Sequence, residues 1–186
     1  REALDAWSSL YAIEGLEAPQ HLRYGLALSR AAYEAKDYKR SISTTESLLK
    51  RSDLPAATQA ELLLIQGKSE EATGATAKAM KTYEPLLKNF DTAYGAEGYI
   101  RHSTLLFRAG KVKETKKQLD AFIAKGTPQQ YWLARAFLLL ADCYHKQGET
   151  YVAQQYLESL RDNYKGTDDD IAQMINERLT SYQNKK

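Results

Sequence analysis

A two-helix motif that recurs along the chain constrains this sequence more than any other feature. Its clearest copy spans residues 131–164, where apolar residues at three- and four-residue spacing lie on both sides of Gly148. They are Phe137, Leu140, Ala141 and Tyr144 before the glycine, and Ala153, Leu157 and Leu160 after it. Two short helices with apolar stripes bury those stripes by facing each other, so the segment is predicted to form a helical hairpin.

The motif is found again when the pattern is moved back along the sequence. Shifts of 38, 36 and 38 residues align the Gly148 corner with Gly110, Gly74 and Lys36. Lys36 is followed by Asp37, which can still cap the next helix. A last shift of 38 residues reaches Trp7 and the end of a second helix whose first helix is missing. The chain therefore begins within a repeat and is expected to be a piece of a larger protein.

The residues at these positions resemble the tetratricopeptide repeat, which places a small residue and a tyrosine in its first helix and an alanine and an aromatic residue in its second. The resemblance covers nearly the whole chain and is strongest at Gly67, Ala79, Tyr83, Ala141, Tyr144, Ala153 and Leu157. The spacing is wider than the family's value of about 34 residues, which longer loops would explain. The resemblance implies an all-α fold, a right-handed α-solenoid of about ten helices with a C-terminal capping helix.

The repeats are expected at residues 19–52, 55–90, 92–125 and 128–165, within a single array over 1–186. A truncated repeat at 1–14 precedes them, and the capping helix at 167–183 follows. Thr167 and the acidic run at 168–170 would supply the N-cap and first turn of that capping helix. Its apolar residues are Ile171, Ile175, Leu179 and Tyr182. At the other end, burial of Trp7 would make its replacement by alanine cost about 3–5 kcal/mol.

Proline and glycine fall at positions that fit these boundaries. Pro19, Pro55 and Pro128 stand where first helices should begin. Gly126 and Gly166 lie just past two second helices, where a left-handed cap is expected. Pro85 lies inside a second helix, which it should kink by removing a backbone hydrogen bond to Lys81.

Composition excludes several functional classes. Hydrophobic residues at 43% and charged residues at 27% are typical of a folded chain, and a net charge of +2 does not favour a nucleic-acid partner. No apolar run is long enough for direct membrane insertion. Cys143 is the one cysteine, so an internal disulfide is excluded and the cellular compartment stays open.

No pattern of catalytic, metal-binding or cofactor-binding residues is present. The histidines His21, His102 and His145 lie in different repeats and form no zinc-binding pair. Cys143 and His145 are two residues apart on one helix and point in different directions. The acidic run at 168–170 could hold a cation, but helix capping explains it better. We therefore expect a non-enzymatic protein without a metal or cofactor.

The resemblance implies that the first helices line a concave face and contact a protein partner there. The candidate partner-binding residues are Arg23, Leu26, Arg30, Tyr33, Glu61, Leu64, Lys68, Glu71, Ile100, Thr104, Phe107, Arg108, Arg135, Leu138, Asp142, His145 and Lys146. Four aliphatic residues among them, Leu26, Leu64, Ile100 and Leu138, would form an apolar floor for a peptide or helix. The alternative is that these residues pack neighbouring repeats together.

Two functions fit this sequence. The first is a protein–protein interaction scaffold that binds a peptide or helical segment of another protein, or of a neighbouring domain of the same chain. The second is an architectural spacer or a self-association array, with contact through the open N-terminal end. A regulatory module fused to an enzyme stays a third option. Residues 132–178 are also similar to the C-terminal part of long tandem-repeat proteins of bacterial envelopes, which implies a periplasmic or membrane-peripheral location.

Overall fold

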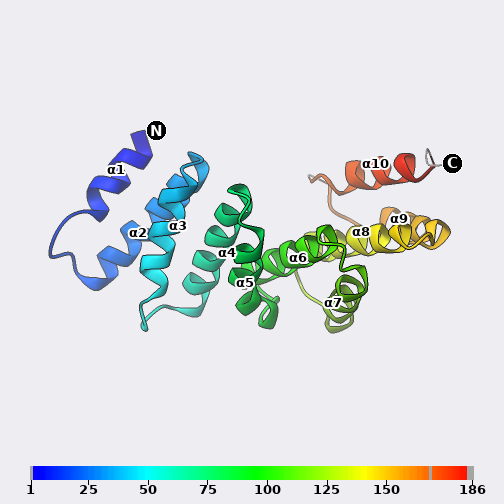
Figure 1. The fold of residues 1–186 in the computed structure, drawn as a ribbon, viewed down its shortest axis with the longest axis horizontal. Helices are drawn as coiled ribbons and strands as arrows, with labels where there is room; N and C mark the ends of the chain where they lie inside the picture. The colour runs from blue at the N-terminus through cyan, green and yellow to red at the C-terminus, as the bar shows by residue number, and fades with distance from the viewer. Residues whose placement is uncertain (1, 168, 184–186) are drawn as a thin grey trace. The chain divides into compact units, whose positions relative to one another are not determined.

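The computed structural model describes residues 2–167 and 169–183, and the regular structure in these residues is helical (Figure 1). The chain divides into two compact units, Arg1–Lys88 and Asn89–Lys186. Each unit is described by itself below.

The first unit contains five α-helices and one 3-10 helix. They are α1 (Glu2–Tyr11), α2 (Ala18–Glu34), α3 (Tyr38–Leu49), α4 (Ala56–Ala72), α5 (Thr76–Tyr83) and the 3-10 helix η1 (Glu84–Lys88). Each helix packs against the next, and α2 also packs against α4. The helix pairs α2–α3 and α4–α5 are therefore neighbouring hairpins whose first helices lie in contact.

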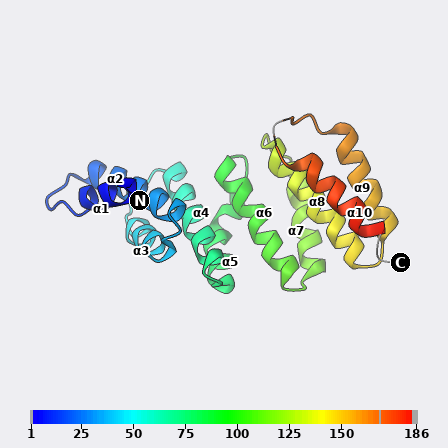
Figure 2. The ribbon, with the colours of Figure 1, turned by 90° about the horizontal axis from the view of Figure 1, so that it is seen from above.

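The second unit has the same arrangement. It contains α6 (Ala93–Arg108), α7 (Val112–Lys125), α8 (Gln130–Lys146), α9 (Thr150–Asn163) and α10 (Ile171–Gln183). Its first helices α6 and α8 are in contact, and α10 packs on both α8 and α9 (Figure 2). Ten α-helices in sequential antiparallel packing confirm the predicted all-α class within the described residues.

The four hairpin corners share one backbone geometry. Gly74, Gly110 and Gly148 have positive φ values of 78°, 78° and 86°, and Lys36 has a φ of 60° at the matching position. After each corner, a backbone N–H donates to the carbonyl five residues earlier at 2.8 to 3.0 Å. Asp37 caps α3 as predicted, since its carboxylate accepts a bond from the Arg40 N–H at 3.1 Å. Lys36 is the one non-glycine residue with positive φ in the described part of the chain.

Two expectations about proline and glycine were wrong in detail. Pro85 does not kink a continuous α-helix, because α5 ends at Tyr83 and the chain continues as η1. A 3-10 turn accommodates the missing N–H of proline more easily than a continued α-helix. Gly126 has a positive φ of 74°, but Gly166 does not and lies three residues beyond the end of α9.

The N-terminal helix α1 packs against α2 through an apolar stripe. Leu4 is the buried residue of α1, whereas Trp7 is half-buried with its ring 6.2 Å from that of Tyr24. Leu4, Trp7 and Tyr11 follow one another at three- and four-residue steps and pack against α2. Because Trp7 is only half-buried, the cost of about 3–5 kcal/mol that full burial would imply does not apply in full.

Close packing in each unit depends on small residues. In the first unit, the Tyr83 ring lies against the backbone of Gly67. In the second, Ala141 and Ala153 are fully buried between α8 and α9, together with Leu157. α10 closes this core with Ile171 and Ile175, as its apolar spacing predicted.

Candidate partner-binding surface

In the first unit, the candidate residues mainly join α2 to α4. The Arg30 guanidinium binds the Glu61 carboxylate through two hydrogen bonds, of 2.5 Å from Nε and 2.8 Å from Nη2. Three residues further along α2, the Tyr33 ring lies 4.8 Å from the Lys68 ammonium of α4. Polar contacts between neighbouring first helices thus use positions that had been expected to contact a partner.

Other candidates of the first unit differ in exposure. Arg23 is exposed and Leu26 is half-buried, so both are accessible on α2. Leu64 is 4% exposed and belongs to the core. The Glu71 carboxylate accepts a 2.5 Å hydrogen bond from the Tyr83 hydroxyl.

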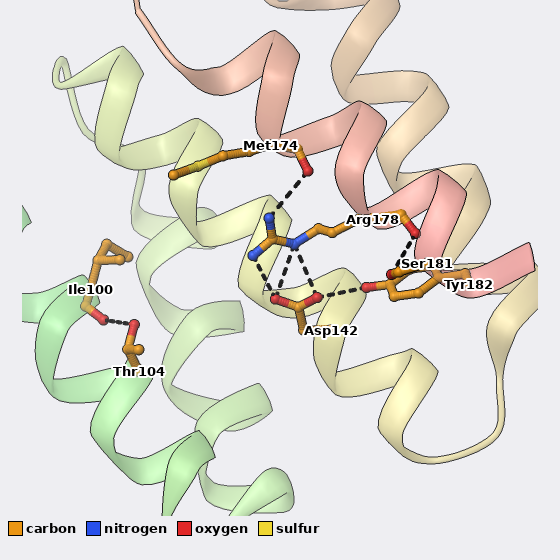
Figure 3. Close-up of polar contacts among 7 residues, drawn as sticks. All are labelled: Ile100, Thr104, Asp142, Met174, Arg178, Ser181 and Tyr182. Atoms are coloured by element: carbon orange, nitrogen blue, oxygen red, sulfur yellow. Dashed lines mark hydrogen bonds and ion pairs between the residues drawn. The ribbon is translucent and has the colours of Figure 1, made fainter. Parts of the chain in front are cut away.

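In the second unit, α6 contributes one buried and three accessible candidates. Ile100 is 3% exposed, and its carbonyl accepts a 2.8 Å bond from the Thr104 hydroxyl (Figure 3). Thr104 and Phe107 are half-buried, and Arg108 is exposed. The last turn of α6 therefore presents an aromatic ring beside a cation.

On α8, the candidate Asp142 is bound by α10. The Arg178 Nε and Nη2 atoms lie 3.0 and 2.8 Å from its carboxylate oxygens, and the Tyr182 hydroxyl donates to it at 2.6 Å (Figure 3). Burial and the hydrogen bond to this carboxylate raise the pKa of Tyr182, so the phenol stays a donor. The His145 ring stacks on that of Tyr182 at 3.9 Å.

The other end of α8 is also joined to the segment that begins α10. The Arg135 guanidinium donates to the Tyr131 hydroxyl at 2.8 Å, and that hydroxyl donates to Asp170 at 3.0 Å. Asp169 caps α10, since its carboxylate accepts a 3.0 Å bond from the Ile171 N–H. The expected contribution of Asp168 lies outside the described residues.

Most of the predicted apolar floor is buried in the core and is not accessible to a partner. Leu138 is 1% exposed and packs in the core with α9 and α10. Because Leu64 and Ile100 are also buried, three of its four residues hold helices together, which is the packing alternative raised from the sequence. Leu26 alone of the four is half-buried.

The sequence reasoning missed Trp132 as a surface residue. Its half-buried ring lies 5.9 Å from the Arg135 guanidinium and 4.9 Å from the Tyr131 ring. Trp132 lies three residues before Arg135, so helical spacing alone could have placed both on one face. Arg178 was missed for a different reason, because nothing in its spacing indicates that it reaches α8.

Within the described residues, no group of three or more His, Cys, Asp or Glu side chains could hold a metal ion. Burial raises the pKa of the Cys143 thiol to about 12, which keeps it protonated and a poor nucleophile. In the same residues, no helix combines the length and apolar character needed to cross a bilayer.

The hairpin α8–α9 contains the segment with a recognisable family. Residues 135–167 match the family model of the tetratricopeptide repeat. Repeats of this kind generally act as protein–protein interaction scaffolds and are typically non-catalytic. A comparison with curated proteins finds no match to this chain. The assignment of the other hairpins to the same repeat stays a prediction from their spacing.

Proposed function

We propose that this protein is a non-catalytic scaffold whose first helices bind a peptide or helical segment of another protein, or of a neighbouring domain of the same chain. The observation that supports this most is the pair Arg108 and Lys146. Both side chains are exposed in the last turn of a first helix, and neither forms an ion pair with any described residue. The nearby Asp142 carboxylate, in contrast, is occupied by Arg178 and Tyr182.

The accessible residues of the second unit have the composition of a binding surface. Phe107 and Trp132 provide aromatic area, and Arg135 lies beside Trp132. Tryptophan and arginine are enriched among the residues that contribute most to protein–protein binding. In the first unit, Arg23 and Leu26 on α2 offer a smaller surface of the same kind.

The proposal is tested by reversing charge on the first helices. The double variant Arg108→Glu/Lys146→Glu should lose the proteins that the tagged chain captures from an extract of its source cells. The control Lys113→Glu/Lys117→Glu changes two exposed lysines on α7 and should keep them. Circular dichroism would establish that both variants are folded. Equal capture by the two variants would contradict binding at this surface.

An architectural array is the second candidate, favoured by a specific observation. α10 covers Asp142 and His145 of α8, and Arg30–Glu61 joins α2 to α4, so several candidate residues hold the chain together. In a purely architectural protein, neither charge-reversal variant would change capture. A periplasmic or membrane-peripheral location is a separate hypothesis, which fractionation of the source cells would test.

A further inference from the structure

The acidic side chains of the first helices in the second unit are already neutralised by cations of the same chain. The helices α6 and α8 contain two acidic residues, Glu97 and Asp142. Glu97 accepts a 2.8 Å hydrogen bond from Arg101, and Asp142 binds Arg178 at 2.8 Å (Figure 3). Their side chains are only 18% and 21% exposed, so these carboxylates offer little to a basic group of a partner.

Two cations of the same helices have no acidic partner. Arg108 and Lys146 are both exposed, and neither forms an ion pair with any described residue. The other two arginines of these helices, Arg101 and Arg135, each lie within 4.0 Å of a carboxylate. The charges that α6 and α8 leave available to a partner are therefore positive.

Arg108 and Lys146 lie at the same end of two neighbouring helices. They occupy equivalent positions, 38 residues apart, in the last turns of α6 and α8, which are in contact. Because α7 returns the chain between them, α6 and α8 run in the same direction, and packed helices lie about 8–10 Å apart. The Lys116 ammonium of α7 also donates to the Gln147 side chain at 3.1 Å, which joins the start of α7 to the end of α8.

Cations outnumber acids in the chain around this end. Residues 108–117 contain five lysine and arginine residues and one acid, Glu114, which lies 3.5 Å from Lys111. Glu149 follows Lys146 across the next corner. Over the whole chain, Lys and Arg exceed Asp and Glu only by 26 to 24, so positive charge is concentrated here. A local excess of this kind attracts an anionic group.

An acidic protein segment fits this arrangement better than a nucleic acid or a membrane surface. Nucleic acids and anionic membranes spread their charge over a wide area and are bound by broad arrays of cations. Here a half-buried ring, Phe107, stands beside Arg108, which favours a partner with apolar as well as charged groups. In an extended segment, acidic residues two positions apart lie on one face about 7 Å from each other. The long side chains of Arg108 and Lys146 can each reach one of them.

We propose that the segment bound by the first helices is acidic and places two carboxylates against Arg108 and Lys146. The proposal rests on the proposed scaffold function and adds the chemistry of its partner. Because both cations are exposed, each ion pair contributes modestly to affinity and is weakened by salt.

The test uses a library of random peptides displayed on phage, selected for binding to the immobilised 186-residue chain. The selected peptides should be enriched in Asp and Glu relative to the starting library. A synthetic copy of the most enriched peptide should bind Arg108→Gln/Lys146→Gln about tenfold more weakly than wild type, as the loss of two exposed ion pairs predicts. The control Lys113→Gln/Lys117→Gln removes two exposed lysines of α7 and should bind within about twofold of wild type.

A reversal of charge would test the contact directly. The same peptide with Lys in place of its acids should bind Arg108→Glu/Lys146→Glu more tightly than it binds wild type. Because all the substituted residues are exposed, these variants should fold, and circular dichroism would check this.

Different results would overturn different claims. Selected peptides without an excess of acids, or acidic peptides that bind Arg108→Gln/Lys146→Gln as tightly as wild type, would overturn the acidic partner but not the scaffold function. A wild-type chain that selects no peptide would overturn both. Phosphatidylserine vesicles or a single-stranded oligonucleotide could instead bind wild type more tightly than the selected peptide does. If Arg108→Gln/Lys146→Gln weakened that binding, these cations would belong to a membrane or nucleic-acid site, and the proposal would be wrong.

Discussion

The ring of Tyr83 in α5 packs against Gly67 in α4 so closely that no β-carbon fits between them. Tyr83 is fully buried, and its hydroxyl donates to Glu71 on α4. The ring is therefore fixed at both ends, by the glycine backbone beneath it and by the carboxylate at its tip. The contact joins the two helices of one hairpin in the first unit.

Gly67→Ala should destabilise the chain by about 1–3 kcal/mol, because the added methyl group overpacks the site against a ring that cannot move. Urea unfolding would measure the loss. A smaller side chain at the partner position makes room, so Gly67→Ala/Tyr83→Leu should cost less than the sum of the two single changes. Strict additivity would show that the two residues do not meet.

Asp142→Ala should loosen α10 from α8, because Arg178 and Tyr182 both lose their shared partner. The two charged side chains are about a quarter exposed, which limits the expected loss to about 1–2 kcal/mol. Compared with wild type, the Asp142→Ala variant should show faster hydrogen exchange in α10, with a smaller change in α2. The comparison variant is Arg161→Ala, which breaks the exposed Arg161–Asp162 pair on α9 and should change little.

Lys36→Gly should stabilise the first unit by about 0.5–1 kcal/mol. A lysine with a φ of 60° is strained by its β-carbon, and glycine removes that strain at some cost in unfolded-state entropy. The matched substitution Gly110→Lys puts a lysine at the equivalent corner of the second unit and should destabilise the chain. Thermal unfolding of both variants would check the pair. A destabilised Lys36→Gly protein would contradict the shared corner geometry.

Stability should fall in alkaline solution partly because of Cys143. Burial raises the pKa of this thiol from 9.0 to about 12, so between these values the unfolded chain releases a proton that the folded chain retains. Stability from this group is complete below pH 9 and is lost as pH rises toward 12. Between pH 9 and 10, wild type should lose about 1 kcal/mol more than Cys143→Ala. If denaturant unfolding shows that wild type and Cys143→Ala lose the same stability between pH 9 and 10, the thiol is in contact with water in the folded chain.

The hairpin corners were predictable from sequence because they depend on local chemistry. Gly74, Gly110 and Gly148 supply positive φ, and Asp37 supplies a cap, whatever surrounds them. The helical pattern of α10 was predictable for the same reason. Each of these features can be inferred from a few neighbouring residues.

The candidate surface was less predictable because it depends on which side of a first helix its neighbours cover. The first helix α4 contacts α2, α3 and α5, and α8 contacts α6, α7, α9 and α10, so neighbouring helices cover several sides of each first helix. Periodicity showed that Leu64 and Leu138 are apolar but not that adjacent helices already cover them. It also could not show that Arg178 reaches Asp142, a contact between residues 36 positions apart.

The most direct test of the proposed scaffold is site-specific photo-crosslinking in source cells. A photoreactive phenylalanine analogue would replace Phe107 or Trp132 on the first helices, or Lys113 on α7 as a control. The proposed function predicts adducts with another protein at Phe107 and Trp132 and far fewer at Lys113. Adducts that are absent from Phe107 and Trp132, or equally frequent at Lys113, would contradict partner binding by the first helices.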